Sequence, residues 1–271
     1  MTLPINHFKQ SLLAGKTQIG LWSTLPSPYI SELIAGCGFD WLLLDTEHTP
    51  TDVTQMMAQL QAVAGAIPMA NRPPSAAVVR PAWNDPVLIK RYLDIGAQSL
   101  LLPFVQNATE AHAAVAAVRY PTQGMRGMGG SVRASNFGRI SNYIQTAHEQ
   151  LCVLVQIETA QALANLDEIA DVDGVDGIFI GPADLSASLG YAGNPRHPEV
   201  DKAINDAIVR IRAKGKAPGI LMVNHERAQE CITLGAQFVA VAADLVVLRE
   251  HLDQIAAKFS GTNTAAERSS Y

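Results

Sequence analysis

The fold of this chain is decided by two apolar runs within one stretch, which read CVLVQIE at Cys152–Glu158 and GIFIGPAD at Gly177–Asp184. Short apolar runs that are rich in β-branched residues and bounded by turn residues are typical of buried parallel strands. The segment between these two runs has a helical pattern. One strand–helix–strand unit would place Glu158 and Asp184 at the same edge of a sheet, where neighbouring strands lie roughly 5 Å apart.

Two carboxylates at that separation repel each other unless a proton or a cation lies between them. Hard divalent cations such as Mg²⁺ are commonly held by one or two carboxylates together with waters and substrate oxygens. The alternative is that both acids are helix N-caps, a role that suits Asp184 and suits Glu158 poorly. Residue type and position therefore favour a metal site over a pair of caps.

The same alternation of apolar runs and helical patterns extends outward through the whole chain. The candidate strands are Ile19–Leu25, Trp41–Asp45, Ala77–Pro81, Ser99–Val105, Cys152–Glu158, Gly177–Gly181, Ala217–Met222 and Phe238–Ala242. The candidate helices are Tyr29–Gly36, Thr51–Ala64, Pro86–Ile95, Ala108–Arg119, Ala160–Ala170, Glu199–Ala213, Glu226–Leu234 and Leu245–Lys258. Eight strand–helix repeats in about 250 residues predict an α/β fold, a (β/α)8 TIM barrel in a single domain.

A doubly wound open sheet is the competing fold, but the first strand leads into no Gly-rich phosphate turn. We expect a lead-in segment at residues 1–18, the barrel domain at 19–260 and a flexible tail at 261–271. Two long connections, Gly65–Ser75 and Gly124–Gly138, interrupt the repeat, and loops of this length are usually functional or mobile.

The overall composition limits the classes of function. The chain has 271 residues, a net charge of −5 and no basic stripe, so nucleic acid is not an expected partner. Neither a signal peptide nor a membrane-length apolar run is present, and a soluble cytoplasmic protein is therefore expected. Cys37, Cys152 and Cys231 are widely spaced in apolar segments, which indicates buried free thiols and not a disulfide framework.

Polar residues follow the predicted strands at the ends that form the active face of a barrel. The second strand ends at Asp45, which Glu47 and His48 follow closely. A carboxylate near an imidazole raises its basicity, so His48 is a candidate general base, although a lone loop histidine is often merely exposed. The fifth strand adds Gln156 beside Glu158.

Two further charged residues stand where a charge is costly. Arg80 ends a buried strand and needs a partner, which could be a substrate anion or a structural carboxylate, and Arg72 is its rival. Asp94 closes a helix, where the helix dipole disfavours an acid, so it has either a specific task or an ordinary solvated role.

The lysines are informative because none of the seven ends a predicted strand. A Schiff-base aldolase needs a pocket lysine with a lowered pKa. Lys216 precedes the seventh strand, at the wrong end of the barrel. The sequence therefore favours metal-assisted chemistry over covalent enamine chemistry.

Five segments together resemble the HpcH/HpaI aldolases, a family of metal-dependent (class II) pyruvate aldolases. They read GFDWLLLDTEH at Gly38–His48, VVRP at Val78–Pro81, LDIGA at Leu93–Ala97, VQIET at Val155–Thr159 and DGVDGIFIGPADLS at Asp173–Ser186. The resemblance extends from Gly20 to about Lys258. It implies a reversible retro-aldol cleavage of a 4-hydroxy-2-oxo acid to pyruvate and an aldehyde, and a homohexamer that exchanges the last helix between barrels.

The resemblance also implies a role for each matching residue. Glu158 and Asp184 would bind a divalent cation, Mg²⁺, Mn²⁺ or Co²⁺, with Zn²⁺ as a further candidate. Gln156 and the backbone at Ala183 and Asp184 would hold the pyruvate part of the substrate.

The acid–base roles that the resemblance implies fall on four residues. His48 would be the general base, and Arg80 would bind substrate and stabilise the transition state. Asp94 would raise the basicity of His48, and Asp45 would support it.

Three alternative functions stay open. A sugar-acid aldolase of the same family, acting on 2-keto-3-deoxy-rhamnonate or 5-keto-4-deoxy-glucarate, would share all these residues. A CoA-thioester lyase with a similar metal pair would need a basic site for the adenine phosphates, which the sequence does not show. A non-catalytic binding barrel would not need acid, base and cation at the strand ends.

Overall fold

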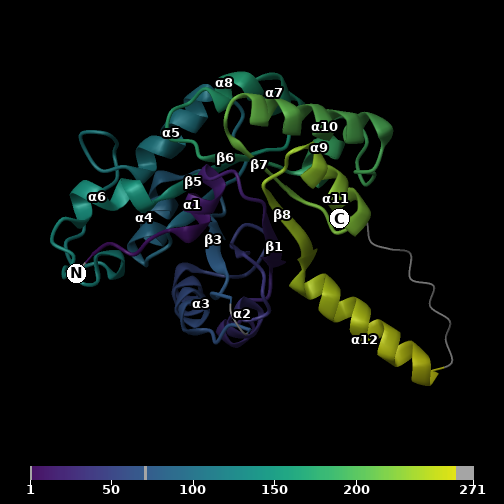
Figure 1. The fold of residues 1–271 in the computed structure, drawn as a ribbon, viewed down its shortest axis with the longest axis horizontal. Coiled ribbons are helices and arrows are strands. Elements are labelled where there is room, and N and C mark those ends of the chain that lie inside the picture. The colour runs from purple at the N-terminus through teal and green to yellow at the C-terminus, as the bar shows by residue number, and fades with distance from the viewer. Residues whose placement is uncertain (1, 70–71, 261–271) are drawn as a thin grey trace.

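The computed structural model describes residues 2–69 and 72–260, and within them eight parallel strands close into a barrel (Figure 1). The strands are β1 (Gln18–Ser23), β2 (Trp41–Asp45), β3 (Ala76–Arg80), β4 (Ser99–Leu102), β5 (Cys152–Ile157), β6 (Gly177–Ile180), β7 (Ala217–Leu221) and β8 (Phe238–Ala243). Each strand pairs in parallel with the next, and β8 pairs with β1. The predicted α/β barrel is confirmed.

Helices surround the barrel and return the chain from the end of one strand to the start of the next (Figure 1). They are α1 (His7–Leu13), α2 (Pro28–Ala35), α3 (Val53–Gly65), α4 (Pro86–Asp94), α5 (Ala108–Val118), the 3₁₀ turn η1 (Arg133–Ser135), α6 (Tyr143–Gln150), α7 (Ala160–Ala164), α8 (Leu166–Ala170), α9 (Pro182–Ser188), α10 (Pro198–Ala213), α11 (His225–Leu234) and α12 (Asp244–Ser260).

Local capping explains where several helices begin. Asp52 accepts a hydrogen bond from the backbone of Gln55, whose side chain in turn accepts one from the backbone of Asp52, so the two form a capping box at the start of α3. Asp85 caps α4, and the following proline occupies the first helical position, where its missing N–H costs nothing.

Three helical features differ from the sequence prediction. The polar lead-in contains α1, whose Phe8 and Leu12 are buried beneath the barrel. The short helix α9 follows β6 directly, and the helix expected at Ala160–Ala170 is divided into two at Asn165. Helices of seven residues or fewer span too few turns to produce a recognisable apolar stripe. The tail predicted at residues 261–271 lies outside the described residues.

The core has two layers. Inside the barrel, Trp41, Phe179 and Phe238 pack with Phe8 of α1, which closes the lower end. A second apolar layer lies between the outer faces of the strands and the helices. These buried layers make the strands a rigid base for the side chains at their ends.

The last helix is an exception, because α12 runs away from the barrel (Figure 1). Its exposed apolar side chains are Leu245, Val247, Leu248, Leu252, Ile255 and Phe259. Isolated apolar side chains on a surface are ordinary, but six on one helix form an uncovered patch. This part of the chain therefore has an apolar surface that the described barrel does not cover.

The cysteine prediction is correct for two of the three thiols. Cys152 and Cys231 are buried and free, whereas Cys37 is free but exposed, so the expectation of burial there was wrong. Cys37 lies in the turn after α2, where its Sγ donates to the carbonyl oxygen of Leu33 at 3.4 Å. Of the helices in residues 2–69 and 72–260, none has the length and apolar character needed to cross a bilayer.

Candidate active site

The carboxyl ends of four strands bring the predicted residues to one rim of the barrel. Asp45 and Arg80 are the last residues of β2 and β3 and are direct partners in the strand register. Gln156 lies near the end of β5, with Glu158 just beyond it. Asp184 lies in the first turn of α9, directly after β6, which pairs with β5. Strand order alone therefore gathers an arginine, an amide and three acids.

Arg80 is buried and held from three sides. Its Nε and Nη2 atoms donate to the two carboxylate oxygens of Asp45 at 2.8 and 2.7 Å. Its Nη1 lies 2.8 Å from Oε2 of Glu47, an ion pair without the alignment of a hydrogen bond. The ring of Trp22 lies 4.6 Å from the guanidinium carbon. The planar fork of arginine suits this bidentate arrangement, which a lysine could not reproduce.

The rival arginine lies elsewhere. Arg72 is exposed, and its Nη1 donates to the backbone oxygen of Gly38, in the turn that leads into β2. That turn belongs to the opposite end of the barrel from Asp45. Arg80 and not Arg72 therefore faces the candidate site.

Glu158 is a buried acid of the rim, with 4% of its surface exposed. Its Oε1 accepts a hydrogen bond of 2.9 Å from the backbone of Phe104, and its Oε2 accepts one from Nε2 of Gln156. A Cβ atom at Gly181 would lie 2.8 Å from Oε2, so only glycine allows β6 to approach this carboxylate.

Burial raises the pKa of Glu158 to about 7. The hydrogen bond from Gln156 opposes that shift, whereas the charges of Asp184 and Glu47 add to it. Burial and the neighbouring negative charges disfavour the ionised form of this carboxylate unless a positive charge lies beside it. The site therefore favours either a proton or a cation at Glu158.

Glu47 belongs to the same electrostatic region. Burial raises its pKa, the charge of Arg80 lowers it, and the charges of Asp45 and Asp184 raise it. Asp184 thus influences Glu47 and Glu158 alike, although its own side chain is exposed.

The residues present fit a divalent cation held by two carboxylates. Within the described parts of the chain, no three His, Cys, Asp or Glu side chains are grouped closely enough to hold a metal alone. Mg²⁺ and similar ions, however, often take one or two carboxylates and complete their coordination with water and substrate oxygens. The buried Oε1 of Gln156 lacks a hydrogen-bond partner within the described residues, which adds an unused oxygen beside Glu158.

The alternative role as helix caps does not apply to either acid. The N-cap of α7 is Thr159, whose hydroxyl accepts from the backbone of Ala162. The N-cap of α9 is Gly181. Glu158 and Asp184 are therefore free of capping bonds, which removes the simplest structural explanation for the pair.

His48 lies on the loop after β2, with 68% of its side chain exposed. Its Nε2 is 3.9 Å from Oε1 of Glu47, so Glu47 is the acid beside it. The carboxylate of Asp45 instead binds Arg80 and the backbone N–H of Glu47. The predicted support of His48 by Asp45 is thus not a direct contact in this structure.

Asp94 is not brought to this rim within one chain. It ends α4, five residues before the start of β4, and therefore lies toward the amino ends of the strands. Its Oδ1 accepts a hydrogen bond of 2.7 Å from Arg126, a buried arginine of the Gly-rich segment that stacks on Tyr120. The predicted effect of Asp94 on His48 stays a prediction.

Two contributors to the rim were not assigned from sequence. Trp22 is apolar and lies inside the predicted strand Ile19–Leu25, so nothing marked it as a partner of Arg80. Phe104 acts through its backbone N–H, which residue type does not reveal. Its φ of 56° is unusual for a bulky residue, a second feature that residue type does not reveal.

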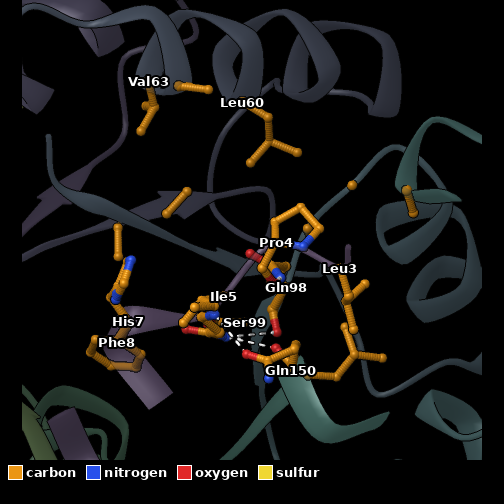
Figure 2. Close-up of a pocket in the computed structure, with 18 of the residues that line it drawn as sticks. Leu3, Pro4, Ile5, His7, Phe8, Leu60, Val63, Gln98, Ser99 and Gln150 are labelled. Atoms are coloured by element: carbon orange, nitrogen blue, oxygen red, sulfur yellow. Dashed lines mark hydrogen bonds between the residues drawn. The ribbon is translucent and has the colours of Figure 1, made fainter. Parts of the chain in front are cut away.

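A cavity of about 1000 Å³ lies at the other end of the barrel (Figure 2). It is lined by the N-terminal segment and by the first residues of strands, including Gln18, Ala76 and Ser99. None of the predicted catalytic or metal-binding residues lines it. The chemistry-bearing residues and this hollow are therefore separate features.

The acids, the amide and the arginine lie at the carboxyl ends of the strands, where α/β-barrel enzymes have their active sites. The fold and the site together are therefore those of an α/β-barrel enzyme. A model of the family described as HpcH/HpaI aldolase/citrate lyase matches residues 18–250. The chain belongs to this family, as its sequence motifs predict, and is a carbon–carbon lyase.

Individual relatives agree with the family assignment. The chain is 55% identical to a 4-hydroxy-2-oxo-heptane-1,7-dioate aldolase of Shigella sonnei (strain Ss046), over 98% of this chain and 99% of that protein. It is 57% identical to the enzyme of the same name from Salmonella heidelberg (strain SL476), over 94% of both chains. A crystal structure of an HpcH/HpaI aldolase/citrate lyase family protein from Burkholderia cenocepacia J2315 superposes with a TM-score of 0.88. That protein is 37% identical, and the match covers 93% of this chain and 98% of the other.

Proposed function

We propose that the chain is a divalent-metal-dependent aldolase that reversibly cleaves 4-hydroxy-2-oxoheptane-1,7-dioate to pyruvate and succinic semialdehyde. The observation that carries the proposal is the desolvated Glu158 carboxylate, within electrostatic reach of Asp184 and beside an unpaired amide oxygen of Gln156. The names of the relatives at 55–57% identity support the choice of substrate. We further propose that it serves the degradation of aromatic compounds (homoprotocatechuate) in the cytoplasm.

Glu158 and Asp184 would hold the cation, and Gln156 would orient Glu158 through its Nε2. A divalent cation there would act as a Lewis acid toward the oxygens of a 2-oxo acid and offset the negative charge that develops as the C3–C4 bond breaks. The backbone N–H groups of Ala183 and Asp184 lie in the first turn of α9, where such groups lack helical partners. They would donate to the substrate carboxylate.

Arg80 and His48 would act on the other side of the substrate. Asp45 and Trp22 hold the Arg80 guanidinium in place, so that a positive charge is already oriented before negative charge develops on a substrate oxygen. His48 would take the proton of the 4-hydroxyl group, and its exposed position on the loop after β2 leaves its imidazole accessible. Glu47 would stabilise the protonated imidazole.

A coupled assay for pyruvate tests the proposal across a panel of 4-hydroxy-2-oxo acids, with metal re-added after chelation. We expect chelator-sensitive release of pyruvate, with succinic semialdehyde as the trapped aldehyde for the best substrate. Trapping of a sugar-derived aldehyde would instead identify a sugar-acid aldolase. Absence of pyruvate from every acid in the panel would favour a binding barrel and contradict the proposal.

We also propose that the chain forms a homohexamer through α12. The support is the uncovered apolar patch on this helix, since Leu248, Leu252 and Phe259 have no described core to pack against. Light scattering should give the mass of a hexamer for the native chain and a smaller mass for Leu252→Glu. A native chain that stays monomeric at enzyme concentrations used in assays would contradict this proposal.

A further inference from the structure

Two exposed aromatic rings lie at the carboxyl-end rim beside the candidate site. Trp83 follows β3 three residues after Arg80, and Phe104 follows β4. Their ring centroids are 5.2 Å apart with an interplanar angle of 30°, a tilted contact within the centroid distances that aromatic pairs favour. The residues are nevertheless 51% and 40% exposed. The pair therefore presents an apolar face to whatever occupies the rim.

Phe104 links this face to the carboxylate at the centre of the site. Its backbone N–H donates to Oε1 of Glu158 at 2.9 Å, so the residue that bears the ring also positions the acid. Its φ of 56° is costly for a bulky side chain, because the left-handed region is open mainly to Gly, Asn and Asp. Backbone outliers of this kind cluster at ligand-binding sites, where the surrounding structure maintains them.

The loops that carry the two rings are anchored. Asn84, next to Trp83, donates to the backbone oxygen of Glu110 at 3.2 Å, and Asp85 caps α4. On the other loop, the backbone of Val105 donates to the oxygen of Gln156 at 3.0 Å. Aromatic side chains on anchored loops lose little conformational freedom when a ligand packs against them.

From this geometry we infer that Trp83 and Phe104 form the wall of the subsite for the aldehyde half of the substrate, and that they select aldehydes with an apolar carbon stem. The inference rests on the proposed function. The cation and the 2-oxo acid would lie at Glu158, and the backbone link through Phe104 makes the aromatic wall their immediate neighbour. The methylene groups next to the aldehyde carbon would then pack on the rings and leave water.

The test is the dependence of aldol addition on the length of the aldehyde. With pyruvate and metal fixed, kcat/KM is measured for acetaldehyde, propanal, butanal and pentanal. In the native enzyme we expect kcat/KM to rise about fourfold for each added methylene group, the value for full burial of such a group. In Trp83→Ala and Phe104→Asn we expect this rise to fall to about twofold or less.

Matched variants separate the wall from general damage. Asn tolerates a positive φ, so Phe104→Asn preserves the backbone that donates to Glu158. Phe137→Asn makes the same change at another exposed phenylalanine, with φ 57° and 60% exposure, that lines the cavity at the opposite end. Phe137→Asn and Trp83→Phe should both keep the native dependence on chain length.

A second measurement reports the pyruvate half of the site alone. Exchange of the C3 hydrogens of pyruvate in D₂O, followed by proton NMR, needs no aldehyde. Chelator-sensitive exchange in the native enzyme with an unchanged length dependence in Trp83→Ala would overturn the aromatic wall and leave the aldolase proposal intact. No exchange in the metal-loaded native enzyme would overturn the proposed function, and the wall with it. Loss of exchange in Phe104→Asn would mean that the substitution disturbs the backbone hydrogen bond to Glu158. The length dependence of Trp83→Ala alone then tests the aromatic wall, because that substitution leaves the backbone at Glu158 unaltered.

Discussion

The two ends of the barrel differ in a way that shows what marks a site. The lower end has the roomy cavity of Figure 2, yet its polar groups are satisfied: Asn6 donates to Ser99 and to the backbone of Gln150, and accepts from Lys9. At the upper rim, Gln156 keeps an unpaired buried oxygen, and burial raises the pKa of Glu158 to about 7. The candidate active site is therefore marked by an unpaired buried polar atom and a carboxylate with a raised pKa, and not by the volume of a cavity.

The largest effect that this comparison predicts is loss of the rim acids. Glu158→Ala and Asp184→Ala should each lower retro-aldol cleavage by about a thousandfold or more, because the charge that develops in the transition state loses its counterion. Pyruvate release measures the loss, and calorimetric titration with Mn²⁺ should show weaker binding in parallel.

The control for that experiment is Asp167→Ala, which removes an exposed acid of α8 that pairs only with Arg210 among the described contacts. It should leave both cleavage and Mn²⁺ affinity unchanged. Full native activity in excess chelator would contradict the assignment of a metal to the upper rim.

The next effect tests whether Arg80 serves the rim chemically or only structurally. Arg80→Gln should lower kcat about a hundredfold and destabilise the fold by about 3–5 kcal/mol, because the buried Asp45 loses its partner. Adding Asp45→Asn should restore most of the stability, measured by urea unfolding, but not the rate.

A matched buried arginine lies outside the site. Arg227 is equally buried and pairs with Asp201 at 3.1 Å. Arg227→Gln should destabilise the chain without changing kcat per folded molecule. If the Arg80→Gln/Asp45→Asn pair recovered the native rate, the role of Arg80 would be structural alone.

The upper rim was largely predictable because parallel strands in a barrel are buried on both faces. Their apolar runs are therefore continuous, and the first acid after each run marks the strand end, as at Asp45 and Glu158. Asp184 needed one step more, since α9 has only seven residues and its place depends on Pro182 at the first helical position.

The features that the sequence did not predict depend on backbone geometry and on the end of the barrel at which a residue lies. The backbone N–H of Phe104 donates to Glu158, and Phe104 has a positive φ; no residue pattern indicated either feature. Asp94 was grouped with His48 by the family resemblance, yet α4 returns the chain to the amino ends of the strands, where Arg126 binds it. The lower cavity depends on α1, whose polar sequence concealed the two apolar residues that pack beneath the barrel.

A smaller effect is expected in the pH dependence of stability and of metal affinity, which Glu158 of the upper rim should control. Because burial raises the folded-state pKa of Glu158 from 4.5 to about 7, the protonated form stabilises the metal-free fold. That contribution is fully present below the unfolded value of 4.5 and is lost as the pH rises through about 7. Metal affinity should change in the opposite sense and weaken by about tenfold per pH unit below 7, because protons compete for the carboxylate.

Thermal unfolding and Mn²⁺ titration between pH 4.5 and 8 measure both effects. Glu158→Gln should remove the contribution of Glu158 to the pH dependence of stability and leave that of Glu47, since an amide does not titrate in this range. A metal affinity that stays constant from pH 8 to pH 5 would show that Glu158 is already ionised without metal, and the contrast between the two ends would be weaker than proposed.

The smallest effect is expected at the lower end, where polar groups are satisfied. Asn6→Ala removes the side chain that caps α1 and that donates to Ser99 and Gln150. Loss of the cap and of these partly buried hydrogen bonds should cost about 1–3 kcal/mol in urea unfolding. The kcat of the folded enzyme should remain native, because Asn6 contacts no residue of the rim in the described structure. A large fall in kcat without loss of stability would show that the lower cavity takes part in catalysis. That result would contradict the assignment of catalysis to the upper rim alone.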